Sequence, residues 1–366
     1  MILFAGGDVG GARALLPVIA ECERQELDFA VVSHGHLLRE LQSTWRQIAL
    51  PDELTADRAS IWLTRLDLSV LIFSSSVHDT VALTLARQAK KMGIAVVHLL
   101  DNWSNYRLRL EHDHLPMLVP DFYMVMDELA YDGALAEGIP ADVLQITGQP
   151  ALAGLSDELA NFTKASRSEG PIGLVFVSEP VLADQGDDPE SPVFRGYTEQ
   201  TVLRLLCREL QRYADQVSLS ILPHPREDRR ALEACWREVQ GKVPGTIFTG
   251  NDGLHHVLTA DGVVGMASIL LYEAWLVGIP VLSLQPGVRG QALRTLERRA
   301  GLFFVDSSEK TDKTLSVWLT AVQSGERIVQ PDLARHKDAA AQICTLITGL
   351  MTENGVFNKR MEAKKA

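Results

Sequence analysis

The sequence lacks several features that mark common protein classes. Its four cysteines show no C-x-x-C spacing, so they form neither a zinc-finger pattern nor a dense disulfide framework. No apolar run reaches the roughly 18 residues that cross a bilayer. No signal peptide is visible either, because Met1–Ala5 runs straight into glycines. We therefore expect reduced thiols and a cytoplasmic protein.

An excess of basic residues is also absent. Lysine and arginine total 35 against 47 acidic residues, which gives a net charge of −12. Proteins that bind nucleic acid carry basic surfaces, so we expect no nucleic-acid partner. With 46% hydrophobic and 22% charged residues in 366, the composition is that of a globular protein of two or three domains.

What is present is a repeated alternation of short apolar runs with longer amphipathic stretches. This alternation is typical of α/β proteins with parallel sheets. The expected strands are Ile2–Ala5, Phe29–Ser33, Val70–Ser74, Ala95–Leu100, Phe122–Met126 and Leu144–Thr147, then Ile172–Ser178, Val217–Leu222, Thr246–Thr249, Gly262–Val264, Val281–Leu284 and Phe303–Val305. The expected helices include Ala12–Gln25, Thr80–Lys91, Tyr197–Tyr213, Arg226–Gln240, Ile269–Val277, Gln291–Arg299 and Leu333–Met351.

The alternation breaks once, in a polar stretch near the middle of the chain. We therefore predict two successive doubly wound, Rossmann-like domains with a linker between them. The predicted boundaries are 1–154 for the first domain, 155–170 for the linker, 171–332 for the second domain, 333–353 for a terminal helix and 354–366 for a loose tail.

One segment of the second half carries the clearest functional signal. Asp261–Ser268 ends in small residues, a helix follows, and Gly278-Ile279-Pro280 leads into a buried strand. The start of a helix offers free backbone N–H groups and the positive end of the helix dipole, so Ser268 is a candidate phosphate contact. Glu273 lies about one and a half helical turns further on and is a candidate ribose contact.

A second motif, Ile221-Leu222-Pro223-His224-Pro225-Arg226-Glu227, follows another strand of the same half. An imidazole and a guanidinium at the start of a helix are suited to phosphate oxygens. His224 and Arg226 are therefore candidate phosphate contacts.

The first strand ends in a glycine loop, Gly6-Gly7-Asp8-Val9-Gly10-Gly11. Glycines let a backbone approach a ligand closely, which makes Gly7, Gly10 and Gly11 candidate substrate contacts, although a plain tight turn explains them equally. The spacing is not G-x-G-x-x-G, and Ser33-His34 ends the second strand where a dinucleotide site needs a carboxylate. We expect no cofactor.

Two carboxylates follow consecutive strands of the first half, in Val77-His78-Asp79-Thr80 and in His98-Leu99-Leu100-Asp101-Asn102-Trp103. Such strand ends meet at one edge of a parallel sheet. Asp8, Asp79 and Asp101 are candidate general bases, with capping of helices or turns as the alternative for the last two. Asn102 and Trp103 are candidate sugar contacts.

These motifs together resemble the GT-B superfamily of glycosyltransferases and non-hydrolysing nucleotide-sugar 2-epimerases. The glycine loop with Pro17 resembles a lipid-linked N-acetylglucosaminyltransferase. Glu137-Gly138-Ile139-Pro140 and Ile146-Thr147-Gly148-Gln149-Pro150 resemble the epimerases, and the segment from Ser268 through Glu273 to Pro280 resembles both groups. The epimerase Gly-Thr-Arg-Pro-Glu start is replaced here, which favours sugar transfer.

The resemblance implies two domains that face each other across a cleft. It also implies donor contacts in the loop Gln285–Gln291, namely Arg289 and Gln291. The His-Pro pairing at His224 is similar to that of bacterial sialyltransferases. The implied function is a glycosyltransferase that moves a sugar from a UDP- or CMP-linked donor to a surface polysaccharide or another sugar, lipid-linked or protein acceptor.

Three alternatives stay open: an epimerase or hydrolase of the same fold, a nucleotide-sugar-binding protein without activity, and an enzyme associated with a membrane surface through Trp62, Leu63, Leu66 and Leu68. The histidine-rich segments His34-Gly35-His36 and Glu111-His112-Asp113-His114 lack a further ligand cluster of recognisable spacing. We therefore predict no metal. The oligomeric state is left open.

Overall fold

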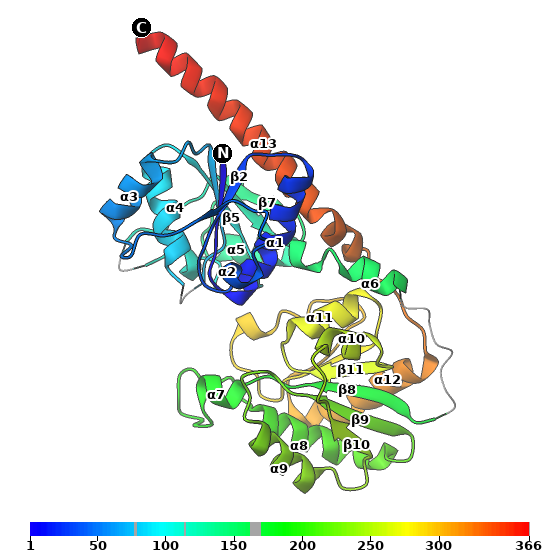
Figure 1. Cartoon of the computed structure of the whole chain (residues 1–366). Coiled ribbons are helices and arrows are strands. Elements are labelled where there is room, and N and C mark those ends of the chain that lie inside the picture. Colours follow the sequence, from blue (N-terminus) through cyan, green and yellow to red (C-terminus); the bar gives the residue numbers. More distant parts are fainter. Residues whose placement is uncertain (77–78, 113–114, 162–169, 366) are drawn as a thin grey trace. The chain divides into compact units, whose positions relative to one another are not determined.

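The computed structural model describes residues 1–76, 79–112, 115–161 and 170–365. Two compact units emerge from the contacts within the chain. The first unit contains Met1–Gly154 together with the last helix, α13 (Asp332–Lys365), and the second contains Leu155–Pro331. Each unit is an α/β structure around its own parallel sheet (Figure 1).

The first unit holds a seven-stranded sheet in the order β3-β2-β1-β4-β5-β6-β7, and every neighbouring pair is parallel. The order reverses direction between β1 and β4, which is the position where open α/β sheets place their ligands. Its strands are β1 (Ile2–Ala5), β2 (Phe29–Val32), β3 (Gln47–Ile48), β4 (Val70–Phe73), β5 (Ala95–Leu99), β6 (Phe122–Val125) and β7 (Leu144–Ile146).

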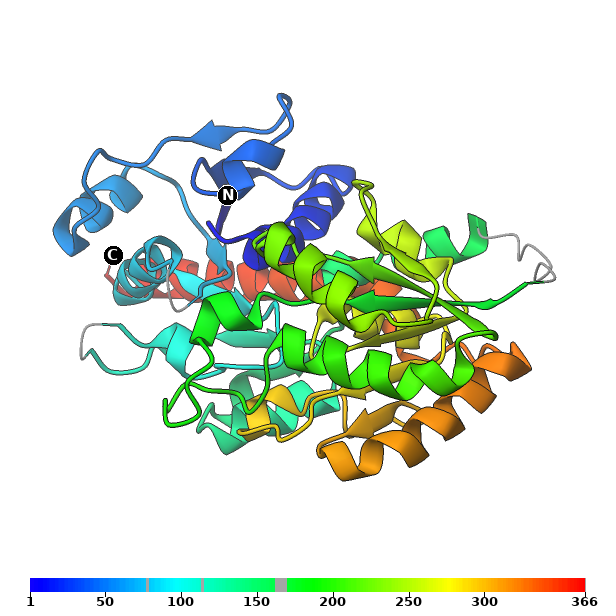
Figure 2. The same cartoon turned by 90° about the horizontal axis from the view of Figure 1, so that it is seen from below.

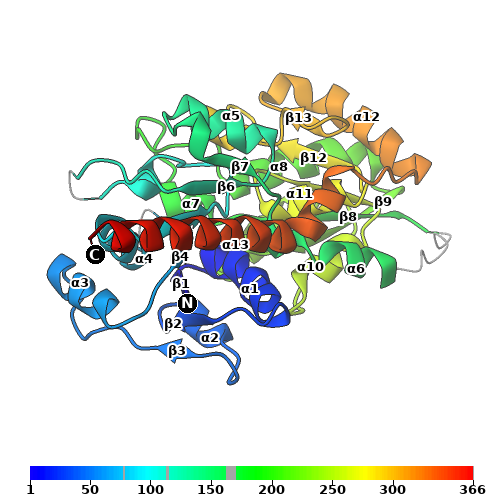
Figure 3. The same cartoon turned by 90° about the horizontal axis from the view of Figure 1, so that it is seen from above.

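Helices cover both faces of this sheet. On one face α1 and the terminal helix α13 lie side by side (Figures 1 and 3), and Leu15 and Ile19 of α1 share a core with Ile343 and Ile347 of α13. On the other face α4 packs on β4 and β5 and contacts α3. The helices of this unit are α1 (Val9–Arg24), α2 (Leu37–Glu40), α3 (Ala56–Thr64), α4 (Val81–Lys91), α5 (Glu128–Ala136) and α13, with short 3₁₀ turns at Leu108–Leu110, Ala141–Val143 and Pro150–Leu152.

The second unit repeats the plan with a six-stranded parallel sheet in the order β10-β9-β8-β11-β12-β13. Here the direction reverses between β8 and β11. The strands are β8 (Ile172–Val177), β9 (Val217–Leu222), β10 (Gly245–Ile247), β11 (Gly262–Gly265), β12 (Val281–Leu284) and β13 (Phe303–Val305).

One face of the second sheet is covered by α8, α9 and α12, which contribute Leu206, Trp236 and Trp318 to a single apolar core (Figures 1 and 2). Helix α11 packs on β11 and β12 and contacts α10. The helices are α6 (Leu155–Asn161), α7 (Val181–Gln185), α8 (Glu199–Leu210), α9 (Arg229–Val239), α10 (Gly253–Leu258), α11 (Ile269–Leu276) and α12 (Thr311–Ser324), with 3₁₀ turns at Gln211–Tyr213, Gln291–Leu293 and Ser308–Lys310.

Twelve of the strands were expected, and the prediction of two doubly wound α/β domains is confirmed. The short edge strand β3 was missed. The prediction of a helix over Gln291–Arg299 is wrong, because only the 3₁₀ turn Gln291–Leu293 forms there. The reason is local: the carbonyl oxygen of Leu293, which a helix would use, accepts from Gln285 Nε2 at 3.0 Å.

The terminal helix α13 runs from Asp332 to Lys365 and so includes the residues for which a tail was expected. Within the part of the chain that the structure describes, none of the helices has the length and apolar character of a membrane-spanning helix.

Candidate functional site

The glycine loop after β1 lies directly against the two carboxylates that follow β4 and β5. A Cβ atom added to Gly7 would lie 2.1 Å from Asp79 Oδ2, and one added to Gly10 would lie 2.2 Å from Asp101 Oδ2. Gly11 is similarly close to Ser74 Oγ, at 2.9 Å. Gly7 and Gly10 are therefore required by the approach of carboxylates, and Gly11 by the approach of a serine hydroxyl, from neighbouring strand ends. The structure brings the predicted loop and both predicted carboxylates together.

Asp79 is paired with a histidine from the end of β2. His34 Nε2 donates to Asp79 Oδ1 at 3.2 Å, and the same oxygen accepts from the backbone N–H of Val81 at 3.1 Å, in the first turn of α4. Among the described residues, Asp79 Oδ2 has no hydrogen-bond partner. The imidazole is 31% exposed and the carboxylate 9%, so His34 is the member of the pair that a ligand can reach.

The pair borders a cavity of about 350 Å³ at this edge of the first sheet. Its lining residues are Gly7, Asp8, His34, Asp79, Thr80 and Val81. An imidazole held by a carboxylate is an acid–base arrangement, because the carboxylate orients the ring and stabilises its protonated form. The cavity therefore joins two predicted residues, Asp8 and Asp79, to a histidine with acid–base capacity.

Asp101 has a different environment. Its Oδ1 accepts from Nη1 of Arg109 at 2.5 Å, and the two side chains are 16% and 6% exposed. Burial opposes the charge of Arg109, but the charge of Asp101 raises its pKa, so the guanidinium stays ionised. Arg109 also donates to the backbone oxygens of Ser75, Ser104 and Asn105. Asp101 is thus held in a partly buried ion pair with Arg109.

The remaining predicted residues of the first unit differ in their surroundings. Asp8 is the N-cap residue of α1 but makes no side-chain capping bond. Asn102 is exposed, and its Oδ1 accepts from the N–H of Trp103 at 2.7 Å. Trp103 is 6% exposed, and its indole N–H donates to both carboxylate oxygens of Asp127 at 2.9 Å. This tryptophan is buried, and its role as a sugar contact stays a prediction.

In the second unit, Ser268 begins helix α11, as the sequence predicts. Its Oγ accepts from the N–H of Leu270 at 3.3 Å, so the side chain caps the helix. The neighbouring N–H group, that of Ala267, donates to Oε1 of Glu179 at 2.6 Å. Glu179 follows β8, and its carboxylate occupies the place where a phosphate was expected.

The charge of Glu179 is subject to opposing influences. Burial raises its pKa, while the backbone N–H groups of Met266, Ala267 and Ser268 and the nearby charge of Arg195 lower it, and the net result is a raised pKa. The turn that contains Met266, Ala267 and Ser268 is held in place by hydrogen bonds from buried side chains. Ser283 and Gln285, both fully buried, donate to the carbonyl oxygen of Met266 at 2.6 and 3.0 Å. The N–H groups of the turn are therefore fixed in direction before any ligand binds.

His224 lies in a turn that follows β9. Its Nδ1 accepts from the N–H of Arg226 at 3.1 Å, which leaves the ring proton of the neutral imidazole on Nε2. Burial and the charge of Arg226 lower the pKa of His224, so the ring is neutral at neutral pH. The guanidinium of Arg226 forms a two-bond pair with Asp184 at 2.7 and 3.2 Å. His224 thus offers a neutral N–H donor, and the charge of Arg226 is balanced.

Glu227 closes this turn. Its carboxylate accepts from the N–H of His224 at 3.1 Å and from the hydroxyl of Ser178 at 2.8 Å. Burial raises the pKa of Glu227 to about 7, against the lowering effect of these two hydrogen bonds. Ser178 and Glu179 are consecutive, so the end of β8 binds both the turn of His224 and the turn of Ser268.

The other predicted residues of this unit are distributed around the same sheet. Glu273 is 3% exposed within α11, so little of its carboxylate reaches solvent. Arg289 lies over the ring of Phe194, 5.3 Å from its centre, and donates to the carbonyl of Pro189 at 2.7 Å. Gln291 is exposed in the 3₁₀ turn that follows.

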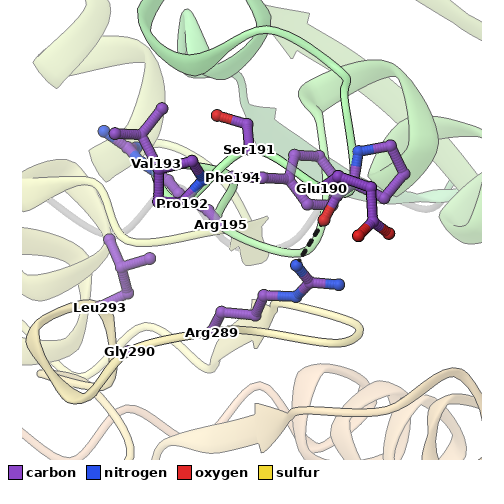
Figure 4. A pocket seen from close by; sticks show the side chains of 10 residues that line it. Glu190, Ser191, Pro192, Val193, Phe194, Arg195, Arg289, Gly290 and Leu293 are labelled. Atoms are coloured by element: carbon purple, nitrogen blue, oxygen red, sulfur yellow. Dashed lines mark hydrogen bonds between the residues drawn. The ribbon is translucent and has the colours of Figure 1, made fainter.

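Arg289 borders a second cavity, of about 590 Å³, between two loops of this unit (Figure 4). The loops approach closely at Gly196, where an added Cβ would lie 1.9 Å from the carbonyl oxygen of Gly287. Figure 4 shows the guanidinium of Arg289 directed toward the Pro189–Phe194 segment. The predicted donor contact Arg289 is therefore part of a formed cavity, and Gln291 is not among its lining residues.

Four residues at these positions were not among the candidate site residues of the sequence analysis: His34, which pairs with Asp79, Arg109, which pairs with Asp101, and the carboxylates Glu179 and Glu227. Glu179 and His34 each follow a buried strand, so the rule that ligands lie at carboxyl ends of parallel strands points to both. Glu227 is within the quoted His224 motif. No sequence signal identifies Arg109, since it lies in a short 3₁₀ turn, Leu108–Leu110, whose position against Asp101 no local pattern encodes.

Some predicted motifs include residues outside the described parts, namely Val77, His78, Asp113 and His114. Among the described residues, no group of three or more histidine, cysteine, aspartate or glutamate side chains is arranged to hold a metal ion.

No protein-family model matches the chain, and no curated protein matches it in sequence. Solved structures do match over almost the whole length. A UDP-N-acetylglucosamine 2-epimerase of Methanocaldococcus jannaschii, in complex with UDP-GlcNAc and UDP, is 15% identical with a TM-score of 0.64, over 95% of this chain and 99% of that one. A putative enzyme of the same name from Listeria monocytogenes is 14% identical with a TM-score of 0.65, over 96% and 97%.

MurG of Acinetobacter baumannii is 12% identical with a TM-score of 0.59, over 95% of this chain and 99% of that one. These matches over almost the whole length show that the chain, with its two parallel sheets, shares the fold of these proteins. The chain has the GT-B fold. In fold it is similar both to UDP-N-acetylglucosamine 2-epimerases and to MurG.

Proposed function

We propose that the protein is a glycosyltransferase that takes a sugar from a UDP-linked donor and uses His34, oriented by Asp79, as its general base. The observation that supports this most directly is the His34–Asp79 pair, bonded at 3.2 Å and bordering a cavity at the carboxyl edge of the first sheet. Of the three predicted bases, Asp79 is the one that pairs with a histidine, His34, at the border of a cavity. Asp101 is instead engaged by Arg109.

The chemistry that we assign to this pair is the deprotonation of an acceptor hydroxyl. As the acceptor oxygen attacks the anomeric carbon, its proton passes to the free nitrogen of His34, and Asp79 stabilises the resulting imidazolium. The bond from the anomeric carbon to the UDP oxygen breaks, and its electron pair leaves with UDP. A single base of this kind suffices for transfer.

We assign the donor nucleotide to the second unit, with the diphosphate at the turn of Ser268 and at His224. Support comes from the start of α11, whose N–H groups are fixed in direction, and from the neutral N–H donor of His224. Charge on the leaving diphosphate is stabilised there without a metal. UDP is favoured among nucleotides because structures of the same fold were solved with UDP-GlcNAc and UDP.

Epimerisation at C2 of the sugar is the second candidate. It is favoured by the presence of another carboxylate, Asp101, whose Oδ2 lies against Gly10 of the same glycine loop, and by the similar epimerase structures. Such a reaction moves a proton at the sugar itself and needs no acceptor.

The two candidates separate in one experiment. Purified protein is incubated with UDP-GlcNAc, first alone and then with soluble and lipid-linked sugar acceptors, while UDP release and the sugar configuration at C2 are followed by NMR. Transfer predicts UDP release that depends on an acceptor and is reduced at least about a hundredfold in His34→Ala. Conversion to the 2-epimer without acceptor establishes epimerisation instead. Binding without turnover under every condition indicates a non-catalytic binding protein.

A further inference from the structure

The turn that follows β9 is closed by its own glutamate. The N–H of Glu227 donates to the carbonyl of His224 at 3.0 Å, and the Glu227 carboxylate accepts from the N–H of His224 at 3.1 Å. These reciprocal bonds fix both ends of a four-residue turn. Pro223 and Pro225 flank His224 and restrict the backbone further.

Glu227 also anchors this turn to another strand. Its second oxygen accepts from the hydroxyl of Ser178, which is 2% exposed at the end of β8. The two residues are 49 positions apart in sequence, and the bond adds a side-chain link to the parallel pairing of β8 with β9, in which the N–H of Ser178 donates to the carbonyl of Leu222 at 2.9 Å. Removing the carboxylate would break the side-chain link between the turn and Ser178 and leave two donors without their acceptor.

The imidazole depends on the same turn for its orientation. His224 Nδ1 accepts from the N–H of Arg226, which lies inside the turn, and this bond leaves the proton on Nε2. The Arg226 side chain points elsewhere, to Asp184. Any change in the backbone of the turn therefore alters the direction of the Nε2–H donor.

We propose that Glu227 is a positioning residue for His224: it holds the turn so that the imidazole presents its N–H to the diphosphate of the donor. This inference rests on the proposed assignment of the nucleotide to the second unit. It predicts that Glu227 contributes to nucleotide affinity through His224 and through no other route. If Glu227 only stabilised the fold, its replacement would lower stability, and the change in nucleotide affinity would not depend on His224.

A double-mutant cycle tests the dependence. The dissociation constant for UDP-GlcNAc is measured by calorimetry in the wild type, Glu227→Ala, His224→Ala and the double variant. We expect Glu227→Ala to weaken binding about tenfold in the wild-type background and less than about twofold in the His224→Ala background. Glu227→Gln keeps a side-chain oxygen acceptor and restores most of the affinity.

Two further variants guard against loss of the fold. Ser178→Ala removes the hydrogen bond from Ser178 but leaves Glu227 in place. We expect this variant to bind UDP-GlcNAc more weakly than the wild type, and we expect the effect to vanish in the His224→Ala background. Glu233→Ala is the matched control, because Glu233 is an exposed glutamate on α9 that pairs with Arg229. It should bind UDP-GlcNAc like the wild type.

The outcomes separate the positioning role of Glu227 from the assignment of the nucleotide to the second unit. If the wild type binds UDP-GlcNAc and Glu227→Ala weakens binding equally in both backgrounds, or in neither, the positioning role is wrong while the nucleotide assignment stands. If the wild type does not bind UDP-GlcNAc, the proposed function fails, and the inference about Glu227 fails with it.

Discussion

The backbone N–H of Ala267 donates to the carboxylate of Glu179 at 2.6 Å, at the start of the helix where the sequence predicts a phosphate. A carboxylate and a phosphate compete for the same N–H groups, and two anions at one helix start repel each other. The proposed nucleotide must therefore displace Glu179 or bind beside it.

Replacement of Glu179 tests this competition. Glu179→Gln keeps an oxygen that accepts from Ala267 but removes the negative charge, so we expect UDP-GlcNAc to bind about three- to tenfold more tightly. Calorimetry at a single pH measures the change, and UDP-GlcNAc is suited because both of its phosphate groups stay ionised across neutral pH. Glu326→Gln, at an exposed position outside both cavities, is the control for loss of one acidic charge. Weaker binding in Glu179→Gln would show that the carboxylate supports the nucleotide.

The titration of the Glu227 carboxyl group makes the stability of the fold depend on pH. Its pKa is about 7 in the folded protein and near its ordinary value of 4.5 in the unfolded chain, so the folded state binds the proton more tightly. The contribution of Glu227 to stability is therefore fully present below pH 4.5, is lost as the pH rises toward 7, and is constant above. The nearby charge of Glu199 acts in the same direction.

The measurement is the free energy of unfolding in urea for the wild type and for Glu227→Gln between pH 4.5 and 8. The wild type should lose stability relative to the variant over this range. An exposed glutamate, changed in Glu233→Gln, should show no such trend. A difference between the wild type and Glu227→Gln that stays constant with pH would mean that the carboxyl does not titrate near neutrality.

Gly10 tests the geometry of the glycine loop. A methyl group in Gly10→Ala would meet Asp101 Oδ2 at 2.2 Å, and Asp101 is held by Arg109, so neither side yields easily. We expect a loss of about 1–3 kcal/mol in the free energy of unfolding. Gly154→Ala is the matched control, since an added Cβ there meets no atom within 4 Å. Equal stability of the two variants would contradict the close approach of Asp101 to the loop.

Replacement of Trp103 distinguishes a role in packing from a role in sugar binding. Trp103→Phe removes the N–H that Asp127 accepts in the interior, and we expect a cost of about 1–3 kcal/mol in stability with unchanged affinity for UDP-GlcNAc. Trp62→Phe, which removes an indole N–H bond at an exposed position, should cost less. A stable Trp103→Phe variant with impaired sugar transfer would instead support the sugar-binding role predicted from the sequence.

The sequence predicts the sheets well because each strand is a buried apolar run bounded by polar turns, as in Val70–Phe73 and Val281–Leu284. It fails where tertiary contacts override local preference. The stretch Gln291–Arg299 has a helical composition, yet Gln285 takes the carbonyl of Leu293 and only a 3₁₀ turn forms. The two-residue strand β3 is too short to leave a pattern.

For the site, the sequence identifies strand ends but not the direction of side chains. Gly7, Gly10, Asp79 and Asp101 lie together in the structure because carboxyl ends of parallel strands meet at one edge, and their roles stay predictions. Which carboxylate pairs with His34 and which with Arg109 depends on contacts across 45 and 8 residues that no local pattern encodes. The occupation of the Ser268 turn by Glu179 is likewise set by the sheet, at a separation of 88 residues.

The most direct test of the account is calorimetric titration of the wild type, His224→Ala and His34→Ala with UDP. The account assigns the nucleotide to the second unit and the acid–base pair to the first. We therefore expect saturable binding of UDP by the wild type. The dissociation constant should rise about tenfold in His224→Ala and stay within about twofold of the wild-type value in His34→Ala. Absence of UDP binding by the wild type, or a loss of affinity in His34→Ala with none in His224→Ala, would contradict it.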